Sequence, residues 1–592
     1  MRRLIALSLL LVAFALCAEP LKIAWLTDIH VTPESEAETL LARAVDEINA
    51  MNDIALVLIT GDLSNLGTKA ELTASYQHIT RLKRPFLAIP GNHETNWSDS
   101  GCTEFARLYG DDKFFHREGD YIFVGVASGP WLQMGDGYIK KRDLAWLESK
   151  LREEVTEDDK VVFVCHYPLN MDLSNAEDAL AILKKFPTIV ALGGHYHSLN
   201  HFDYNGIPGI LGRAISMRHN NMPTPGYNLL EIDGDAVKLF NKPIDEPMEA
   251  EPRIVAGISP MQEVTFRPAE NAPMPRELEL FREVEGSLFA PIAITANGII
   301  FDDNEKEFSG ILPGHNVLVR GSVAGRIEAT SINSKGTNWR IETEAPITNT
   351  GLIVENVLHM GLGTDHFVAI NTSTGEEIWR FSGVNGRFQA PPAVRDNIVA
   401  FGAWDTHLYV LDRNTGELKW KWNNGSTAVG YSPGNVTPMI GSKNIAIVAP
   451  DRYLTIFNRE NGTVLLRSNE YKFRESLVGD GGFYAYAKTM DGELVVVDVD
   501  KATIEKVIDA GLGYEHTPCP PAVMFGDIFV TGRQGDLVRI DPKSGEVKWR
   551  YRCGKSAFIQ LAQDSEENYL YAVMLDGKIY RVSGLIADCD SP

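Results

Sequence analysis

The chain contains little cysteine, with six residues in 592 at spacings that match no zinc motif. If Cys17 is removed with a leader segment, five cysteines remain, and an odd number in an exported chain leaves at least one free thiol. A disulfide such as one between Cys519 and Cys553 stays open, because sequence alone cannot assign pairings. The cysteines therefore give no reason to expect a thiolate metal site.

Positive charge is also scarce. Lysine and arginine number 56 against 79 acidic residues, which gives a formal net charge of −23. Such a charge repels polyanions at long range. We therefore expect no nucleic-acid partner and no general affinity for anionic membranes.

Long apolar runs are absent after the first residues of the chain. Met1-Arg2-Arg3 is basic, the run from Leu4 to Leu16 is apolar, and the small residue Ala18 follows. This order is typical of a cleavable export signal over residues 1–18, and an uncleaved anchor is the alternative. No other run approaches the roughly 20 residues that a membrane helix needs. We expect an exported protein, periplasmic or secreted, with no transmembrane segment in the mature chain.

Two regions with different patterns of apolar residues follow. From residue 19 to 245, short apolar runs alternate with stretches that have the apolar spacing of helices, which predicts an α/β fold. The last apolar segments, around Phe202, Ile210, Leu229 and Val237, lack intervening helices and suggest antiparallel strands. Seven prolines between Pro243 and Pro275 then predict an acidic linker over residues 246–285.

Residues 286–592 contain a repeat. The segment ending Thr374-Gly375-Glu376-Glu377-Ile378-Trp379 recurs with ends at Trp420 and Trp549, and weaker copies end at Trp339, Leu466 and Lys506. The steps between these ends are about 40 to 46 residues, a period typical of propeller blades. A partial copy surrounds residues 575–580. We expect an all-β propeller of seven blades, the first of them irregular over residues 290–339.

These repeats resemble the pyrroloquinoline-quinone-type β-propeller. The resemblance implies that the glycine closes a hairpin and the tryptophan packs between neighbouring blades. It would also imply a quinone cofactor, but no two cysteines are adjacent and four repeats lose or weaken the tryptophan or the glycine. We therefore expect no pyrroloquinoline quinone, and interpret the propeller as a scaffold or as a recognition surface for a protein or glycan.

Five motifs follow predicted strands of the first region. They are Asp28-Ile29-His30, Gly61-Asp62, Gly91-Asn92-His93-Glu94, His166, and Gly194-His195-Tyr196-His197. Binding sites in open α/β sheets form at the carboxyl ends of strands, so these motifs can converge. Carboxylate, imidazole and amide donors without thiolate suit borderline or hard divalent metals. Cys165 precedes His166 in a strand and should point into the core.

The five motifs resemble those of the calcineurin-like metallophosphoesterases, and the segments 61–67 and 143–147 are similar to the cyclic-nucleotide phosphodiesterase branch. The resemblance implies a four-layer α-β-β-α sandwich and two divalent metal ions such as Mn, Fe or Zn. By position, one metal is held by Asp28, His30, Asp62 and His197, and the other by Asp62, Asn92, His166 and His195. His93 matches the catalytic histidine that is not a ligand.

The sequence therefore predicts a dinuclear-metal phosphoric ester hydrolase. A metal-activated hydroxide would cleave a small phosphomonoester or phosphodiester. The alternative hypothesis is a binding protein that acts through its propeller and has little or no catalytic activity.

Overall fold

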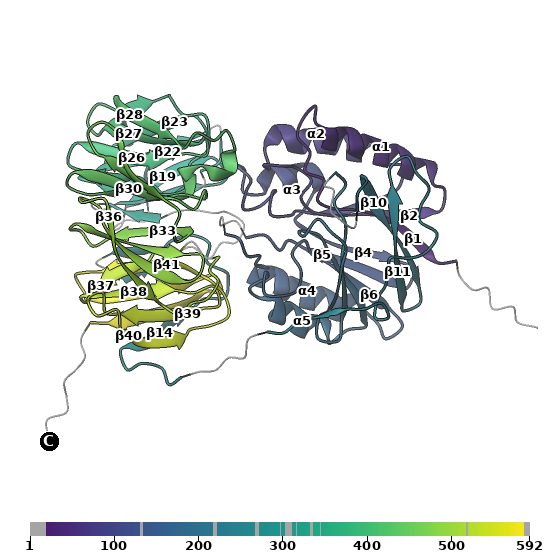
Figure 1. Cartoon of the computed structure of the whole chain (residues 1–592). Coiled ribbons are helices and arrows are strands. Elements are labelled where there is room, and N and C mark those ends of the chain that lie inside the picture. The colour runs from purple at the N-terminus through teal and green to yellow at the C-terminus, as the bar shows by residue number, and fades with distance from the viewer. Residues whose placement is uncertain are drawn as a thin grey trace, which may run out of the picture.

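The computed structural model describes the chain from residue 19 to 584, apart from short internal gaps. The described ranges are 19–130, 134–216, 222–266, 272–295, 298–301, 311–314, 317–331, 336–343, 345–347, 349–516 and 519–584. The expected leader, with Cys17, and Cys589 lie outside them. Figure 1 shows an α/β domain beside a ring of sheets. Within these ranges, no helix combines the length and apolar character needed to cross a membrane.

The first sheet of the α/β domain joins a parallel and an antiparallel half. Its order is β12-β11-β10-β1-β2-β3. The strands β1 (Leu21–Leu26), β2 (Ile54–Thr60) and β3 (Phe86–Ile89) run parallel. Antiparallel pairing adds β10 (Gly226–Asp233), β11 (Ala236–Pro243) and β12 (Ile254–Val255). The expected antiparallel addition of the segments around Leu229 and Val237 is confirmed.

The second sheet has the order β13-β8-β9-β7-β6-β5-β4. Its parallel strands are β5 (Tyr121–Val126), β6 (Lys160–Val164), β7 (Thr188–Gly193) and β9 (Pro208–Leu211). The strand β4 (Lys113–Glu118) is antiparallel to β5, and β8 (Asn200–Asp203) is antiparallel to β9, while β13 (Gln262–Glu263) is parallel to β8. The segment around Ile210, which is β9, is predicted to be antiparallel, and it is antiparallel to β8. Toward β7 the prediction is wrong, because the short strand β8 reverses the chain direction and β9 then pairs with β7 in parallel.

Alternation along the strands creates the four layers. In β1, Ala24 and Leu26 face a cluster with α1 (Glu36–Ala50), while Ile23 and Trp25 face the second sheet. The same helical layer includes α2 (Lys69–Ile79) and α3 (Thr103–Tyr109). The opposite outer layer consists of α4 (Lys141–Glu154) and α5 (Ala176–Leu183). The predicted α-β-β-α sandwich is confirmed.

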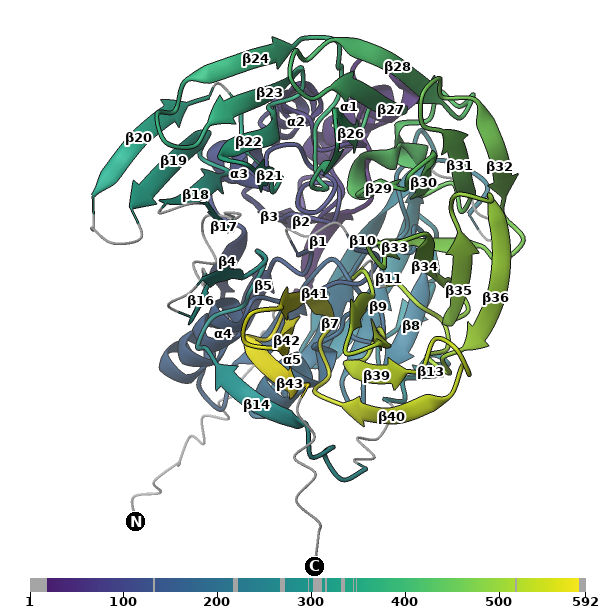
Figure 2. The same cartoon turned by 90° about the vertical axis from the view of Figure 1, so that its left-hand side faces the viewer.

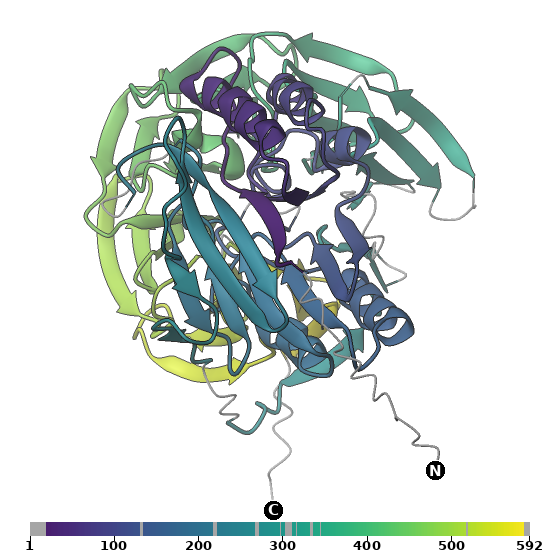
Figure 3. The same ribbon diagram turned by 90° about the vertical axis from the view of Figure 1, so that its right-hand side faces the viewer.

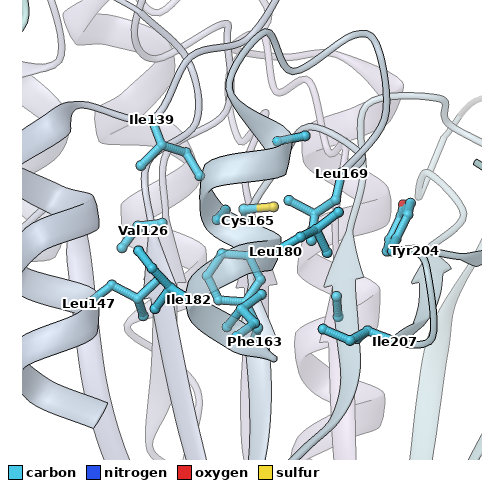
Figure 4. Packing of buried hydrophobic residues seen from close by; sticks show 14 of the residues in the cluster. Val126, Ile139, Leu147, Phe163, Cys165, Leu169, Leu180, Ile182, Tyr204 and Ile207 are labelled. Carbon is cyan, nitrogen blue, oxygen red and sulfur yellow. The ribbon is translucent and has the colours of Figure 1, made fainter. Parts of the chain in front are cut away.

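Figure 4 shows the core beneath the second helical layer. Leu147 of α4 and Ile182 of α5 lie beside Phe163 and Cys165, which belong to one cluster of buried residues. Cys165 is buried and unpaired, so the prediction that it is a core residue is confirmed. Val162 and Val164, the alternate residues of β6, pack between the sheets. This register leaves the end of β6 free to present His166 at the sheet edge.

Seven four-stranded sheets form the propeller, as the repeats predict. Figure 2 shows them arranged as blades around a ring, with strands such as β24 and β36 on its rim. The first three blades comprise β17 (Ile311–Pro313), β18 (Val317–Ser322), β19 (Arg326–Ser331) and β20 (Thr337–Glu342); β21 (Leu352–Val354), β22 (Val357–Leu362), β23 (His366–Asn371) and β24 (Glu377–Phe381); and β25 (Ala393–Arg395), β26 (Ile398–Gly402), β27 (His407–Asp412) and β28 (Leu418–Asn423). The next three comprise β29 (Met439–Ile440), β30 (Asn444–Val448), β31 (Leu454–Asn458) and β32 (Val464–Ser468); β33 (Phe473–Gly479), β34 (Tyr484–Thr489), β35 (Glu493–Asp498) and β36 (Thr503–Asp509); and β37 (Ala522–Met524), β38 (Asp527–Thr531), β39 (Asp536–Ile540) and β40 (Val547–Arg552). The last blade comprises β41 (Phe558–Asp564), β42 (Tyr569–Met574), β43 (Lys578–Ser583) and β14 (Leu278–Glu283). A further two-stranded sheet joins β15 (Ala293–Thr295) and β16 (Gly298–Ile300).

Three of the repeated tryptophans, Trp339, Trp379 and Trp420, pack on the glycine turn of the next blade. Gly416 has a φ of 74°, and a Cβ there would lie 2.6 Å from the Trp379 ring. The indole N–H of Trp379 donates to the Arg413 carbonyl at 2.8 Å. Trp420 repeats the arrangement with Gly462 and the carbonyl of Arg459. These tryptophans and glycines therefore pack neighbouring blades together, as the resemblance to the pyrroloquinoline-quinone-type propeller implies.

The segment expected to be a linker contributes strands to both domains. Within residues 246–285, β12 and β13 pair with the two sheets of the first domain. The strand β14 pairs with β43 and closes the last blade. Figures 2 and 3, taken from opposite sides, show the first domain lying against one face of the ring.

Candidate metal centre

The sequence motifs meet at the carboxyl ends of strands from both sheets. Asp28 and His30 follow β1, Asp62 follows β2, and Asn92 follows β3. From the second sheet, His166 follows β6, while His195 and His197 follow β7. The loops are tied together by their backbones, since Asp28 N–H donates to the Gly61 carbonyl at 3.1 Å. The structure thus brings together all seven residues that the sequence singles out as ligands.

Two groups of donor atoms share one carboxylate. The first group is Asp28, His30, Asp62 and His197, and the second is Asp62, His166 and His195; within each, one atom of every residue lies within 4.8 Å of the others. Asp62 Oδ2 is 3.1 Å from His166 Nε2 and 3.8 Å from His30 Nε2. Asp62 therefore lies between two sets of ligand atoms.

Asn92 lies beside the second group. Its Oδ1 atom is 3.0 Å from His166 Nε2 and 3.0 Å from His195 Nδ1. An amide oxygen this close to two imidazole nitrogens can complete a set of ligands for a hard or borderline cation.

The backbone at the site adopts a rare conformation. Five of the seven residues have positive φ: Asp28 (49°), His30 (53°), Asp62 (52°), His195 (71°) and His197 (58°). Such left-handed conformations are uncommon outside glycine, and they cluster at functional sites. Neighbouring glycines make room, because a Cβ on Gly91 would lie 2.2 Å from Asp62 Oδ1 and one on Gly194 would lie 2.5 Å from Asp28 Oδ2.

The burial and charge of the two carboxylates fit bound cations. Asp28 is fully buried and Asp62 is 1% exposed. Among the described residues neither has a lysine or arginine within ion-pair distance, and the basic side chains closest to them are histidines. His30 Nε2 and His197 Nε2 face each other at 3.2 Å. Buried charges are normally paired or coordinate metals, so this donor set fits divalent cations.

The pKa values of these groups differ from their ordinary values. Burial raises the pKa of Asp28, partly opposed by His166 and His197. Burial would also raise the pKa of Asp62, but the surrounding histidines, above all His166, hold it well below its ordinary value.

Among the imidazoles, burial lowers the pKa of His30 and of His195 to about 3. These two rings are therefore neutral near pH 7, with lone pairs available to a cation. At His166 the neighbouring Asp62 outweighs burial and raises the pKa to about 9.

Backbone carbonyls orient two of the histidines. His166 Nδ1 donates to the Thr60 carbonyl at 2.7 Å, which turns Nε2 toward Asp62 and Asn92. His93 Nδ1 donates to the Asn65 carbonyl, and its Nε2 lies 3.9 Å from Asp62 Oδ2. Hydrogen bonds of this kind fix which ring nitrogen faces a metal or a substrate. Outside the donor groups, His93 presents Nε2 at their edge.

Glu94 joins the loops that carry Asp62 and Asn92. Its carboxylate accepts hydrogen bonds from Ser64 N–H at 2.9 Å, from the Ser64 hydroxyl at 2.6 Å and from Gly91 N–H at 2.9 Å. The side chain is fully buried. Glu94 therefore connects the two loops, and the two donor groups are formed by other side chains, namely those of Asp28, His30, Asp62, His166, His195 and His197.

Several residues near the site were not expected from the sequence. The Tyr167 ring lies 4.1 Å from the His195 ring, and the Trp97 ring lies 6.5 Å from the His93 ring. From the propeller, Arg533 binds Asp172, whose other oxygen accepts a hydrogen bond from Tyr196. No local sequence signal marks Arg533, whereas Tyr167 and Tyr196 are adjacent to ligands and could have been considered.

Two families match separate parts of the chain. Residues 21–199 match the family described as Calcineurin-like phosphoesterase. Residues 323–505 and 484–588 match the family described as Outer membrane protein assembly factor BamB. The solved structure of BamB from Moraxella catarrhalis aligns with 52% of this chain and 99% of its own, at 18% identity and a TM-score of 0.43.

Curated relatives match the first domain. A 3',5'-cyclic-nucleotide phosphodiesterase from Nostoc sp. is 23% identical over 260 residues, which is 39% of this chain and 96% of that protein. A glycerophosphodiester phosphodiesterase from Enterobacter lignolyticus is 27% identical over 187 residues, or 28% of this chain and 63% of that protein. All seven clustered residues and His93 lie within residues 21–199.

Proposed function

We propose that this chain, which belongs through its first domain to the calcineurin-like phosphoesterases, is an exported phosphodiesterase that works with two divalent metal ions. The family and the phosphodiesterase relatives make the first domain that of a metal-dependent phosphoric ester hydrolase. The observation that carries the proposal is the position of Asp62 in both donor groups. The names of the relatives favour a diester over a monoester as substrate.

In this proposal Asp28, His30, Asp62 and His197 hold one cation, and Asp62, Asn92, His166 and His195 hold the other. Manganese, iron and zinc suit such oxygen and nitrogen donors. When bound, the cations supply positive charge that offsets the phosphate oxygens, and they lower the pKa of a water molecule. A local positive centre is needed because the whole chain carries a net charge of −23.

His93 acts on the substrate in this proposal. Its Nδ1 donates to the Asn65 carbonyl, which leaves Nε2 to hold or release a proton at the edge of the site. An imidazole there can protonate the leaving oxygen as the ester bond breaks. The hydrogen bond to Asn65 keeps the ring in the required orientation.

Substitution of Asp62 tests the proposal. The purified chain should contain about two divalent metals and hydrolyse bis(4-nitrophenyl) phosphate, and chelation should abolish the activity. Asp62→Ala should lose metal from both sites. Asp143→Asn is the matched control, because Asp143 is also a buried acid of this domain but pairs with Lys113 and Lys140. Full metal content in Asp62→Ala would refute the assignment.

We propose two further roles on the basis of the sequence. Residues 1–18 direct export, which is supported by the basic start and the apolar run that follows it. Fractionation of cells that express the chain with and without residues 1–18 tests this role, and equal distribution of the two forms contradicts it. The propeller serves as a recognition or scaffold domain. In this proposal, the propeller surface that contacts the catalytic domain is the part of the propeller nearest the substrate.

A further inference from the structure

A pocket lies between the catalytic domain and the propeller. Its volume is about 250 Å³, and it is lined from one side by Leu66, Trp97 and Asp99 and from the other by Asn385, Arg387 and Trp404. In Figure 1 the propeller segments involved, near β26 and β27, face the loops beside α3. Pockets for whole drug-sized ligands begin at roughly 300 Å³, so this pocket has room for one part of a substrate.

The pocket is connected to the metal centre through a series of rings. The His30 ring lies 4.6 Å from the His93 ring, and the His93 ring lies 6.5 Å from the Trp97 ring. Trp97 meets Trp404 edge to face, with centroids 5.8 Å apart and planes at 84°. Trp97, which lines the pocket, is therefore the ring next to His93 at the edge of the metal centre.

Specific contacts hold the propeller side chains of the pocket in place. Trp404 is 5% exposed, and its indole N–H donates to Gln389 Oε1 at 3.1 Å. The Arg387 guanidinium lies 5.4 Å from the Trp404 ring centroid and donates to the Ser98 carbonyl of the catalytic domain. These contacts fix the Trp404 ring in one orientation across the domain boundary.

We propose that this pocket binds a planar aromatic group of the phosphate ester, on the leaving side of the bond, against the edge-to-face pair that Trp97 and Trp404 form in its wall. Two tryptophans offer apolar surfaces that favour a flat ring. Asp99 and Arg387 at the same pocket offer an acceptor and a donor to polar atoms on that ring. The propeller thus supplies half of a substrate subsite. The assignment of the leaving side rests on the proposed role of His93.

Binding of two phosphonates tests the pocket without any hydrolysis. Phenylphosphonate and methylphosphonate share the anionic group and differ in the ring. The metal-loaded full-length chain should bind phenylphosphonate about 3- to 10-fold more tightly, as measured by calorimetry, the range expected for an aromatic contact. Trp404→Ala and Trp97→Ala should each abolish this preference, while Trp404→Phe should retain most of it.

Trp422→Ala is the matched control. Trp422 is another propeller tryptophan, but it packs against Phe457 and Arg467 away from the pocket. This variant should keep the wild-type preference. Equal binding of the two phosphonates by the wild type, or a preference that persists in both Trp404→Ala and Trp97→Ala, overturns the proposal.

Kinetics add a second measurement. With bis(4-nitrophenyl) phosphate, Trp404→Ala should raise KM by about 3- to 10-fold and leave the metal content unchanged. An unchanged KM contradicts the subsite. A wild-type chain that hydrolyses no ester would refute the proposed function instead, and the phosphonate measurement would still decide the pocket.

Discussion

Arg533 is the residue whose loss should most weaken the contact between the domains. Its Nε lies 2.7 Å from Asp136 Oδ2 and its Nη2 lies 2.6 Å from Asp172 Oδ1. The Arg533 side chain is 10% exposed and that of Asp136 is 1% exposed. Arg533→Ala leaves Asp136 Oδ1 in contact with His516 Nδ1, 2.9 Å away.

The expected cost follows from this burial. Removing one partner of a buried ion pair typically destabilises a protein by about 3 to 5 kcal/mol, because the other charge is left uncompensated. We take the lower end, since His516 remains beside Asp136. A loss of about 3 kcal/mol corresponds to a decrease in melting temperature of roughly 6 to 12 °C for a domain of this size.

Lys555→Ala provides the control. Lys555 also crosses the boundary, to Glu177 at 3.0 Å, but the two side chains are 44% and 36% exposed. An exposed pair contributes about 0 to 1 kcal/mol, so this variant should melt within a few degrees of the wild type. Differential scanning calorimetry compares the two. Equal melting temperatures for Arg533→Ala and Lys555→Ala would show that burial of the pair does not decide its strength.

At acid pH, the difference in melting temperature between Arg533→Ala and the wild type should be smaller than at neutral pH. Burial would raise the pKa of Asp172, but hydrogen bonds from Tyr196 and Arg533 hold it below its ordinary value. A lowered carboxyl pKa stabilises the fold above the unfolded value of about 3.9, and the stabilisation is lost as the pH falls through the folded pKa. The gap in melting temperature should therefore narrow below about pH 4.

Three further predictions concern the chemistry and the two domains. His93→Ala should lower kcat by roughly 10² to 10⁴ at unchanged metal content, as expected for a lost general acid or base; metal analysis decides, since loss of metal would make His93 a ligand. A fragment of residues 19–266 should melt at a higher temperature than one of residues 19–244, because it retains β12 and β13; coincident melting curves would contradict this. Trp420→Ala should destabilise the propeller by about 3 to 5 kcal/mol with little effect on kcat for a small ester, measured by denaturation and by kinetics; an unchanged denaturation midpoint would refute the packing role.

The sequence by itself determined the local elements and the composition of the site. The alternation of short apolar runs with stretches of helical spacing predicted the α/β fold to which β2 and α4 belong, because the spacing of apolar residues reflects which face of an element is buried. The motifs identified all seven clustered residues, because polar groups after parallel strands share one sheet edge. The period of the repeats, about 40 to 46 residues, indicated the number of blades.

Only the tertiary structure decided the long-range pairings. The parallel pairing of β9 with β7, and the closure of the last blade by β14, depend on which strand edges remain unpaired after the chain has folded back. The positive φ of Asp62 and its neighbours is also imposed by the packed loops and not by residue type. Arg533 and Trp404 belong to a repeat whose local pattern serves blade packing, and their contacts with the catalytic domain arise from docking of two separate surfaces. Contacts between residues hundreds of positions apart leave no periodic trace in the sequence, so the half of the interdomain pocket that the propeller supplies could be recognised only in the folded chain.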